Sequence, residues 1–363
     1  MIVPTCIRNF DFRPLDIPLY APFGISGGAQ AVANNVLVSL ELDDGTTGYG
    51  EAAPLPPYNG ETQAGTLVVL EQARGWLVGH AAADWRALAE EFRGRGGAGC
   101  GAAQGAFEMA LLDALARRDG VPLWKVFGGA GTTLETDMTV TTGSPSEAAA
   151  AARDIRARRI RMIKVKVGGP GGPDYDLARL TAIHEVAPAA PLILDGNAGL
   201  SRADASALVR GLRARGITPA LLEQWLAKDD LAGMHALGDE SGWPVAADES
   251  VCSAHDVARI AQARAAQFVN IKLMKAGIGA ALDIVAVARR EGLGLMIGGN
   301  VESILAMTVS ACFAAGQGGF TYADLDTPLF LAANPFDGGY ALDGGIISVA
   351  HISSGHGVVP RAG

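Results

Sequence analysis

The chain has 363 residues, and 49% of them are hydrophobic, which is typical of a globular protein with one or two domains. The formal net charge of −9 disfavours a nucleic-acid partner, because binding to phosphates requires clustered cations. No basic start followed by an apolar stretch opens the chain, and its longest nearly apolar run, 304–315, is shorter than the ~20 residues of a membrane span. We therefore expect a cytoplasmic protein without a membrane partner.

The first part of the chain changes from strand to helix periodicity. Residues 1–60 alternate with period two, as in 36–42 before a DDG turn, which predicts an antiparallel meander. Residues 61–119 have the 3.6-residue period of amphipathic helices. We predict an α+β domain over residues 1–125.

Short apolar strands then alternate with helices, and we expect this barrel domain to cover residues 126–326. The predicted strands are 136–141, 161–167, 191–195, 220–224, 245–248, 268–273, 294–298 and 320–325. Eight strands that alternate with helices are typical of a closed barrel, although a helix after the last strand is weak. Residues 327–363 resemble a short hairpin region, and we expect them to return to the first domain.

Charged residues stand at the ends of five successive strands. Neighbouring members of this series are 24 to 29 residues apart, about the length of one strand, one helix and two loops. Because the carboxyl ends of barrel strands meet at one mouth, we expect these side chains to surround one cavity. The five residues are Lys166, Asp195, Glu223, Asp248 and Lys272.

The lysines of this series suggest proton transfer. Lys164 and Lys166 share one face of the second strand, and the other face is apolar, so both should point into the barrel. We expect each to lower the pKa of the other, which would allow a lysine to act as a general base. Lys272 ends the sixth strand, opposite the second, so Lys166 and Lys272 could reach one carbon from opposite faces. We expect Lys275, in the following loop, to be solvated.

Three carboxylates, Asp195, Glu223 and Asp248, end three consecutive strands without a histidine or cysteine. Hard oxygen ligands of this kind suit Mg²⁺, with Mn²⁺ as a second candidate, and do not suit Zn²⁺. The alternative is that each carboxylate caps the helix that follows it. Three in succession favour the metal site.

Asp324 and Asp326 lie two residues apart at the end of the eighth strand. Two carboxylates that face a cavity select a cation such as a substrate ammonium group. The alternative is a local turn before Pro328. The sequence pattern alone leaves both interpretations open.

The segments KVKVG, ILDGN, LLEQ, ADES and NIKLMKAG, in this order, resemble the muconate-lactonizing subgroup of the enolase superfamily over nearly the whole chain. The resemblance implies a modified TIM barrel, (β/α)7β, with an α+β capping domain. It implies that Asp195, Glu223 and Asp248 bind Mg²⁺, which stabilises an enediolate formed from the substrate. It also implies that Lys166 and Lys272 are the acid and base, and that Lys164 supports Lys166.

The segment DLDTP further resembles the dipeptide epimerases, which include the L-Ala-D/L-Glu epimerases. In that group the Asp pair anchors the free ammonium of the dipeptide, and Thr139 matches a substrate-contacting position. The resemblance thus implies inversion of the α-carbon of the C-terminal residue by 1,1-proton transfer. The Ala-Glu enzymes carry an arginine in the loop that here reads PFGISGGAQ. No lysine or arginine occurs from Pro22 to Gln63, so we expect a neutral or cationic second residue.

Other functions share the same lysines. An N-acylamino acid racemase, an o-succinylbenzoate synthase or a muconate cycloisomerase would act on substrates without a free ammonium. A non-enzymatic metal-binding barrel is the third possibility, and the two opposed lysines disfavour it. A small-molecule substrate is the expected partner, and a homo-oligomer is compatible with the sequence.

Overall fold

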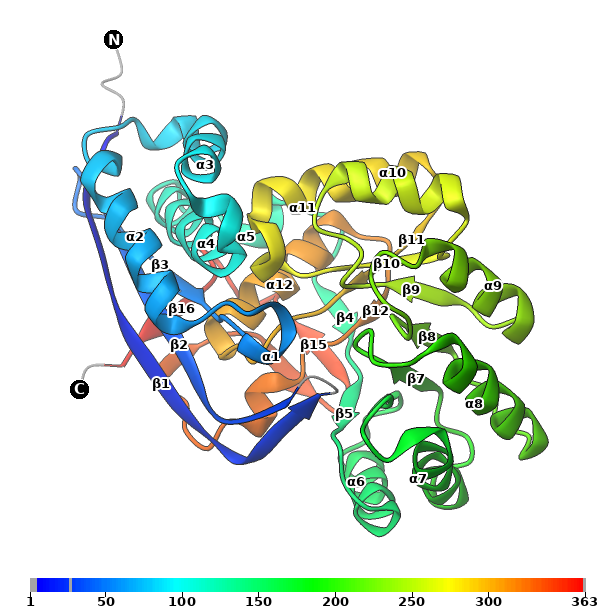
Figure 1. The fold of residues 1–363 in the computed structure, drawn as a ribbon. Helices are drawn as coiled ribbons and strands as arrows, with labels where there is room; N and C mark the ends of the chain where they lie inside the picture. Colours follow the sequence, from blue (N-terminus) through cyan, green and yellow to red (C-terminus); the bar gives the residue numbers. More distant parts are fainter. Residues whose placement is uncertain (1–4, 26–27, 362–363) are drawn as a thin grey trace.

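The computed structural model describes residues 5–25 and 28–361. Its N-terminal part confirms the predicted α+β unit, an antiparallel sheet in the order β1-β2-β3 covered by helices (Figure 1). The strands are β1 (Ile7–Ile25), β2 (Gly28–Leu42) and β3 (Thr47–Ala52). The helices are α1 (Pro56–Asn59), α2 (Gln63–Leu77), α3 (Trp85–Gly94), α4 (Gly101–Arg118) and α5 (Leu123–Val126), with short 3-10 turns at Ala82–Asp84 and Gly97–Gly99.

Helix α4 joins the sheet to the barrel. A Cβ atom on Gly50 of β3 would lie 2.1 Å from the carbonyl oxygen of Ala106, so only glycine allows the sheet and α4 to approach this closely. On the barrel side, a Cβ on Gly101 would lie 2.2 Å from the carbonyl oxygen of Lys275. Asn300 also donates a hydrogen bond of 2.9 Å to the carbonyl of Ala53. The N-terminal part is therefore fixed against the segment that follows Lys272.

Eight parallel strands form the barrel sheet, and each corresponds to a predicted strand. They are β5 (Met138–Val140), β6 (Ile163–Lys166), β7 (Leu192–Asp195), β8 (Leu221–Glu223), β9 (Val245–Ala247), β10 (Phe268–Ile271), β11 (Gly294–Ile297) and β12 (Phe320–Ala323). A parallel bridge between Thr136 and Ala323 joins the first strand region to the last.

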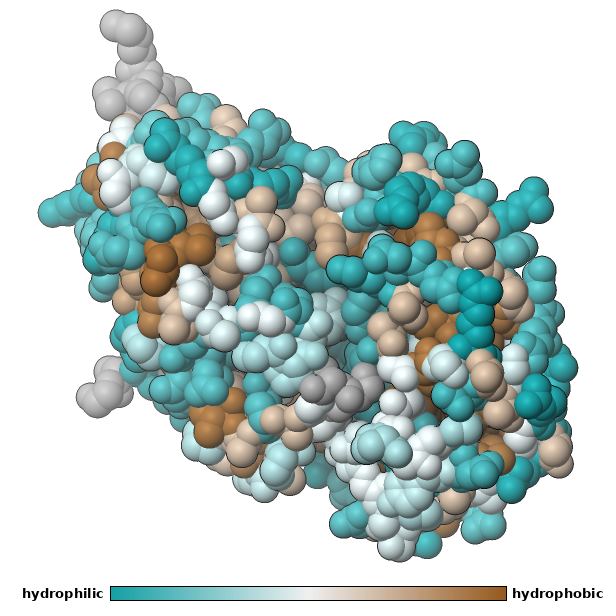
Figure 2. Space-filling model, viewed as in Figure 1, coloured by the Kyte–Doolittle hydropathy of each residue, from teal (hydrophilic) through white to brown (hydrophobic). Residues whose placement is uncertain are grey.

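Helices connect successive barrel strands and lie outside them (Figure 1). They are α6 (Pro145–Ala157), α7 (Gly172–Val186), α8 (Arg202–Ala214), α9 (Leu231–Ser241), α10 (Ala254–Ala263), α11 (Leu273–Arg290) and α12 (Ile304–Gln317). Within the described residues, β12 is followed only by a 3-10 turn, Thr327–Phe330, so the prediction of a (β/α)7β barrel is confirmed. In Figure 2 the surfaces of α8, α9 and α10 are mostly hydrophilic, as expected for helices whose apolar side packs on the strands.

The last part of the chain forms short strands that contact both halves of the molecule. The strands are β13 (Phe336–Gly338), β14 (Ala341–Asp343), β15 (Ile346–Ser348) and β16 (Val358–Pro360), and β15 pairs with β4 (Thr133–Glu135) beside the barrel. Ala332 donates a 2.8 Å hydrogen bond to the carbonyl of Pro18, and Arg117 of α4 donates one of 2.7 Å to the carbonyl of Val358. The three domain boundaries stay a prediction.

In the part of the chain that the structure describes, no helix has both the length and the apolar character needed to cross a membrane.

Candidate active site

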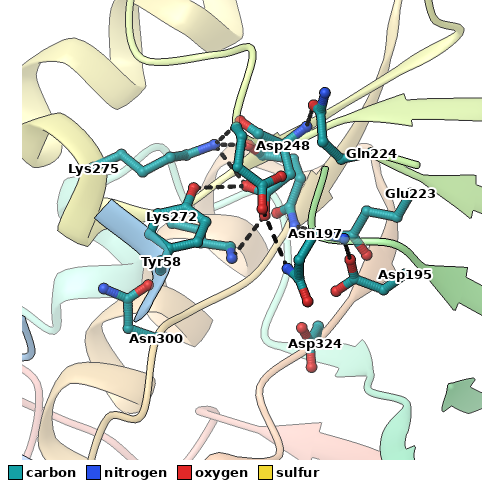
Figure 3. A network of polar contacts seen from close by, with 12 residues as sticks. Tyr58, Asp195, Asn197, Glu223, Gln224, Asp248, Lys272, Lys275, Asn300 and Asp324 are labelled. Atoms are coloured by element: carbon teal, nitrogen blue, oxygen red, sulfur yellow. Dashed lines mark hydrogen bonds and ion pairs between the residues drawn. The ribbon is translucent and has the colours of Figure 1, made fainter. Parts of the chain in front are cut away.

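Charged residues at the strand ends, among them Asp195, Asp248 and Lys272, meet at one end of the barrel (Figure 3). Asp195 and Glu223 are the last residues of β7 and β8, Asp248 directly follows β9, and all three are fully buried. Lys166 ends β6 and Lys272 directly follows β10, each with 6% exposure. The strand order β5 to β12 makes β6 the second strand and β10 the sixth, so the two lysines come from opposite walls.

One small pocket contains both lysines. It is lined on the barrel side by Lys166 and Lys272, together with Thr139, Asn197, Gly299, Asn300, Asp324 and Thr327. On the other side it is lined by Phe23, Leu55 and Tyr58 of the N-terminal part. The barrel side of the pocket is therefore charged, and the side formed by the N-terminal part is apolar and aromatic.

Lys164 is fully buried among carboxylates. Its Nζ atom lies 2.9 Å from oxygens of both Asp195 and Glu223 and 2.6 Å from Asp324. Burial lowers the pKa of Lys164, but the neighbouring carboxylates raise it by more. The pKa of Lys164 therefore lies well above its ordinary value. The expectation that neighbouring lysines lower this pKa is wrong, because Lys164 is surrounded by negative charge.

Lys166 and Lys272 each contact a carboxylate on the neighbouring strand. Lys166 Nζ lies 2.6 Å from Asp195 Oδ2, and Lys272 Nζ lies 2.8 Å from Asp248 Oδ2. Burial lowers the pKa of Lys272, but Asp248 outweighs burial and raises it above the usual range. Lys272 is thus held as an ammonium in this arrangement.

Lys275 is not solvated as expected. Its side chain is 4% exposed, and its Nζ atom donates to Asp248 Oδ1 at 2.9 Å and to the carbonyls of Asp248 and Asn270 at 2.8 and 2.7 Å (Figure 3). The reason is that α11 starts directly after Lys272, so the first helical turn directs Lys275 back toward β9. Lys275 fixes one oxygen of Asp248 and leaves the other directed at Lys272.

Neighbouring amides position the other carboxylates. Asn270 donates to Glu223 Oε1 at 2.7 Å, and the backbone N–H of Asn197 donates to Asp195 Oδ1 at 3.0 Å. Gln224 accepts a 2.8 Å hydrogen bond from the backbone N–H of Asp248. In Asp195, Glu223 and Asp248, one oxygen is therefore held by an uncharged donor or by Lys275, and the second faces a lysine.

The three predicted metal ligands have the donor chemistry of a Mg²⁺ site. Glu223 Oε2 and Asp248 Oδ2 are buried, and each faces an ammonium group, that of Lys164 at 2.9 Å and that of Lys272 at 2.8 Å. Burial and the charge of Asp195 raise the pKa of Glu223 to about 7, and Lys164 offsets them only in part. Buried, fixed, hard oxygens fit a divalent cation. In this structure the ammonium of Lys164 lies between Asp195 and Glu223.

Three other carboxylates have side-chain oxygens that lie close to one another. Within the described ranges, one oxygen from each of Asp137, Asp324 and Asp326 lies within 4.8 Å of the other two, whereas the three predicted metal ligands form no such group. Asp324 lines the pocket and is 7% exposed. Asp326 is 1% exposed, and its Oδ2 atom accepts a 2.6 Å hydrogen bond from the backbone N–H of Thr139.

Tyr58 connects the N-terminal part to the barrel chemistry. Lys272 Nζ lies 4.6 Å from the centre of the Tyr58 ring, a cation–π contact, and the Tyr58 hydroxyl is 3.4 Å from Asp248 Oδ1 (Figure 3). Helix α1, which begins with Pro56, presents this ring. A long-range contact of this kind has no local sequence signal.

Other positions missed from the sequence did have a signal. Asn270 lies two residues before Lys272, and therefore on the same face of its strand, next to Glu223. Asp137 lies two residues before Thr139 in the first predicted strand. Alternation along these two strands would have added both residues to the site.

The comparisons with known proteins agree with this fold. The family model for the mandelate racemase / muconate lactonizing enzyme N-terminal domain matches residues 12–128, and the enolase C-terminal domain-like model matches residues 147–362. The chain belongs to the mandelate racemase / muconate lactonizing enzyme family. This finding confirms the resemblance to the enolase superfamily.

Within this family, the chain is similar over nearly its whole length to proteins that are named as dipeptide epimerases. An aromatic dipeptide epimerase of Herpetosiphon aurantiacus is 51% identical, with 98% of this chain and 99% of the relative covered. The substrate-liganded L-Ala-D/L-Glu epimerase of Bacillus subtilis is 34% identical with a TM-score of 0.94, covering 98% and 99% of the two chains. The dipeptide epimerase of Enterococcus faecalis, in complex with Mg and L-Leu-L-Tyr, is 29% identical with a TM-score of 0.92, covering 97% and 99%.

Proposed function

We propose that this protein is a Mg²⁺-dependent dipeptide epimerase that inverts the α-carbon of the C-terminal residue. The observation that carries the proposal is that Lys166 and Lys272, from opposite walls of the barrel, line one pocket together with the carboxylate of Asp324. The relatives named as dipeptide epimerases support an isomerase of this class. The test is to incubate L,L-dipeptides with the protein and to quantify the L,D products by chiral chromatography. Absence of epimerisation across a broad panel would contradict the proposal.

The two lysines would divide one proton transfer between them. One lysine, as the free amine, removes the α-proton, and the electron pair of the broken C–H bond moves into the carboxylate to give an enediolate. The opposite lysine, as the ammonium, then returns a proton to the other face of the same carbon, so that the configuration inverts. Because the reaction is reversible, each lysine serves as the base for one epimer and as the acid for the other.

We assign the metal to Asp195, Glu223 and Asp248. When bound, Mg²⁺ supplies positive charge that stabilises the negative charge developing on the substrate carboxylate. The chain's own part is to hold these oxygens in place through Asn270, the backbone of Asn197, and Lys275. The complex of the Enterococcus faecalis relative with Mg and a dipeptide supports this choice of ion.

We assign Asp324 and Asp326 to the N-terminal ammonium of the dipeptide and Thr139 to the same end of the pocket. Replacing Asp324 with Asn should lower kcat/KM for a free dipeptide by roughly one to two decades, because a hydrogen bond between charged groups contributes about 1.5–3 kcal/mol. Steady-state kinetics on a dipeptide and on its N-acetyl form provide the measurement and its control. If the wild-type enzyme processes both forms equally well, the ammonium site is refuted.

The position of this Asp pair also favours the epimerase over its alternatives. Substrates of N-acylamino acid racemases, o-succinylbenzoate synthases and muconate cycloisomerases have no ammonium, and a solvated Asp pair would have favoured them. Asp324 and Asp326 are instead almost fully buried, and Asp324 lines the pocket. Lys164 Nζ lies 2.6 Å from one oxygen of Asp324, but Asp326 Oδ1 is buried without a hydrogen-bond partner among the described residues, so the pair can accept a further cation.

The second residue of the dipeptide should be apolar, aromatic residues included. Phe23, Leu55 and Tyr58 line the pocket opposite the lysines, and no arginine occurs among its described lining residues. Two acidic residues of the segment from Pro22 to Gln63, which could attract a cationic second residue, have other partners. Glu51 accepts hydrogen bonds from Ser303, and Glu61 accepts them from the N–H groups at the start of α4. Ser26 and Gly27 of the loop in question lie outside the described residues.

Kinetics on Ala-Phe, Ala-Leu, Ala-Lys and Ala-Glu should therefore show the highest kcat/KM for the apolar pair. Phe23→Ala should lower kcat/KM for Ala-Phe about tenfold, because the contact that removes apolar surface from water is lost. Tyr20→Ala, at a residue 77% exposed on the same strand, is the matched control. A clear preference for Ala-Glu would contradict this specificity.

A further inference from the structure

Asp137 is a buried carboxyl group without a hydrogen-bond donor. It is 0% exposed, and in the part of the chain that the structure describes neither of its side-chain oxygens has a hydrogen-bond partner. Its backbone N–H donates a 2.9 Å hydrogen bond to the carbonyl of Ala323, so the closure of the barrel fixes its position. An ionised carboxylate in such a place would be strongly destabilised unless a cation or a proton compensated it.

The side chain lies directly beside the proposed ammonium site. One of its oxygens is within 4.8 Å of an oxygen of Asp324 and of one from Asp326. Asp326 Oδ1 is likewise buried without a hydrogen-bond partner among the described residues. Three carboxyl groups thus share a small volume, and two of them have unused oxygens.

The positive charge near Asp137 is shared with other carboxylates. The cation acting most strongly on Asp137 is Lys164, whose Nζ atom is shared among Asp195, Glu223 and Asp324. The acidic groups that face Asp137 come from several elements: Glu223 at the end of β8, and Asp324 and Asp326 after β12. Tyr340 of the C-terminal segment, whose hydroxyl donates to the carbonyl of Leu325, faces Asp326.

We propose that Asp137 is a positioning residue that remains a neutral acid and donates its proton in a hydrogen bond to the Asp324–Asp326 pair. In this role Asp137 favours the ionised form of the pair, which can then bind a substrate ammonium. If Asp137 were also ionised, repulsion between three negative charges would oppose that form. The inference rests on the proposed function, and it adds a third carboxyl group to the ammonium site. No bond other than the hydrogen bond is formed or broken.

The directions of the pKa shifts agree with this division of roles. Burial and the charge of Asp324 raise the pKa of Asp137 well above its ordinary value, and the same two causes raise the pKa of Asp326 to about 7. Burial raises the pKa of Asp324, but Lys164 outweighs it, so the net pKa of Asp324 is lowered. The neutral form of Asp137 is therefore favoured, Asp324 stays ionised, and Asp326 titrates near neutrality.

This arrangement has a consequence for the pH dependence of substrate binding. As the pH falls through about 7, Asp326 takes up a proton and the site loses negative charge. The affinity for an ammonium group then decreases, so kcat/KM for a free dipeptide should fall on the acidic side. Substrate ammonium and proton compete for the same carboxylate pair.

Two matched variants test the role of Asp137. Asp137→Asn keeps an N–H donor of similar size, whereas Asp137→Leu removes the donor with little change in volume. A neutral donor favours the ionised form of the carboxylate that it contacts, so its loss should raise the pKa of Asp326. The acidic midpoint of kcat/KM against pH, measured with Ala-Phe, should move up by about one pH unit in the Leu variant and stay in place in the Asn variant. Equal shifts in both variants would overturn the proposal.

A spectroscopic measurement tests the proton itself without substrate. The infrared difference spectrum of wild type minus Asp137→Asn, at pH 8, should contain the C=O stretching band of a protonated carboxylic acid. An ionised Asp137, or one that holds a metal cation in place of the proton, would lack this band and would overturn the proposal even if the Leu variant fails to fold. Because this readout needs no turnover, it is separate from the proposed function, which would fail if wild type epimerised no dipeptide.

Discussion

Lys272→Ala should abolish epimerisation, with kcat lowered by about 10²–10⁴-fold, the usual contribution of a general acid or base. The reason is that Lys272 is one of the two lysines that line the pocket from opposite walls, so its loss leaves one face of the α-carbon without a proton donor or acceptor. Chiral chromatography of the products measures the effect. Lys228→Ala, at an exposed lysine, is the matched control.

Lys272→Ala should still exchange the α-proton of one epimer. Lys166 remains in place, and it can still exchange the α-proton of the epimer whose C–H bond faces it. Lys166→Ala should show the complementary pattern, with exchange confined to the other epimer. Normal epimerisation by either variant would show that the two-base mechanism is wrong.

Removal of the metal should have an effect of similar size. Treatment with a chelator should lower kcat/KM by at least about 100-fold, since charge stabilisation by a bound metal contributes several kcal/mol. Added Mg²⁺ should restore the activity. Asp195→Asn should lose activity that Mg²⁺ cannot restore, while Asp229→Asn, at an exposed aspartate, should behave as wild type. Full activity of a metal-free sample would contradict the assignment of the three ligands.

The barrel and the strand-end charges could be predicted because both depend on local patterns. Each barrel strand is a short apolar run, and Asp195, Glu223 and Lys166 stand at the ends of their strands as expected. Parallel strands in sequence order then bring these ends together without further information. The sequence therefore predicted which charged strand ends meet at the barrel mouth, and the roles of these residues stay a prediction.

The missed features depend on contacts between distant segments. Tyr58 reaches Lys272 only because α4 and the loop after β3 pack on the barrel. Lys275 looked like a loop residue, yet the early start of α11 directs it to Asp248. Asp137 meets Asp324 and Asp326 only when the first strand region closes on the last. The predicted lowering of the Lys164 pKa is wrong for the same reason, because carboxylates from distant segments and not lysines dominate its surroundings.

In the proposed mechanism, groups of this pocket deprotonate and reprotonate one α-carbon. Proton NMR of an L,L-dipeptide such as Ala-Phe, incubated with the enzyme and Mg²⁺ in heavy water, tests it most directly. We expect the α-proton signal of the C-terminal residue to disappear, the L,D-dipeptide to appear with deuterium at that carbon, and the N-terminal α-proton to persist. Retention of the C-terminal α-proton, or its exchange at the N-terminal residue instead, would contradict the account.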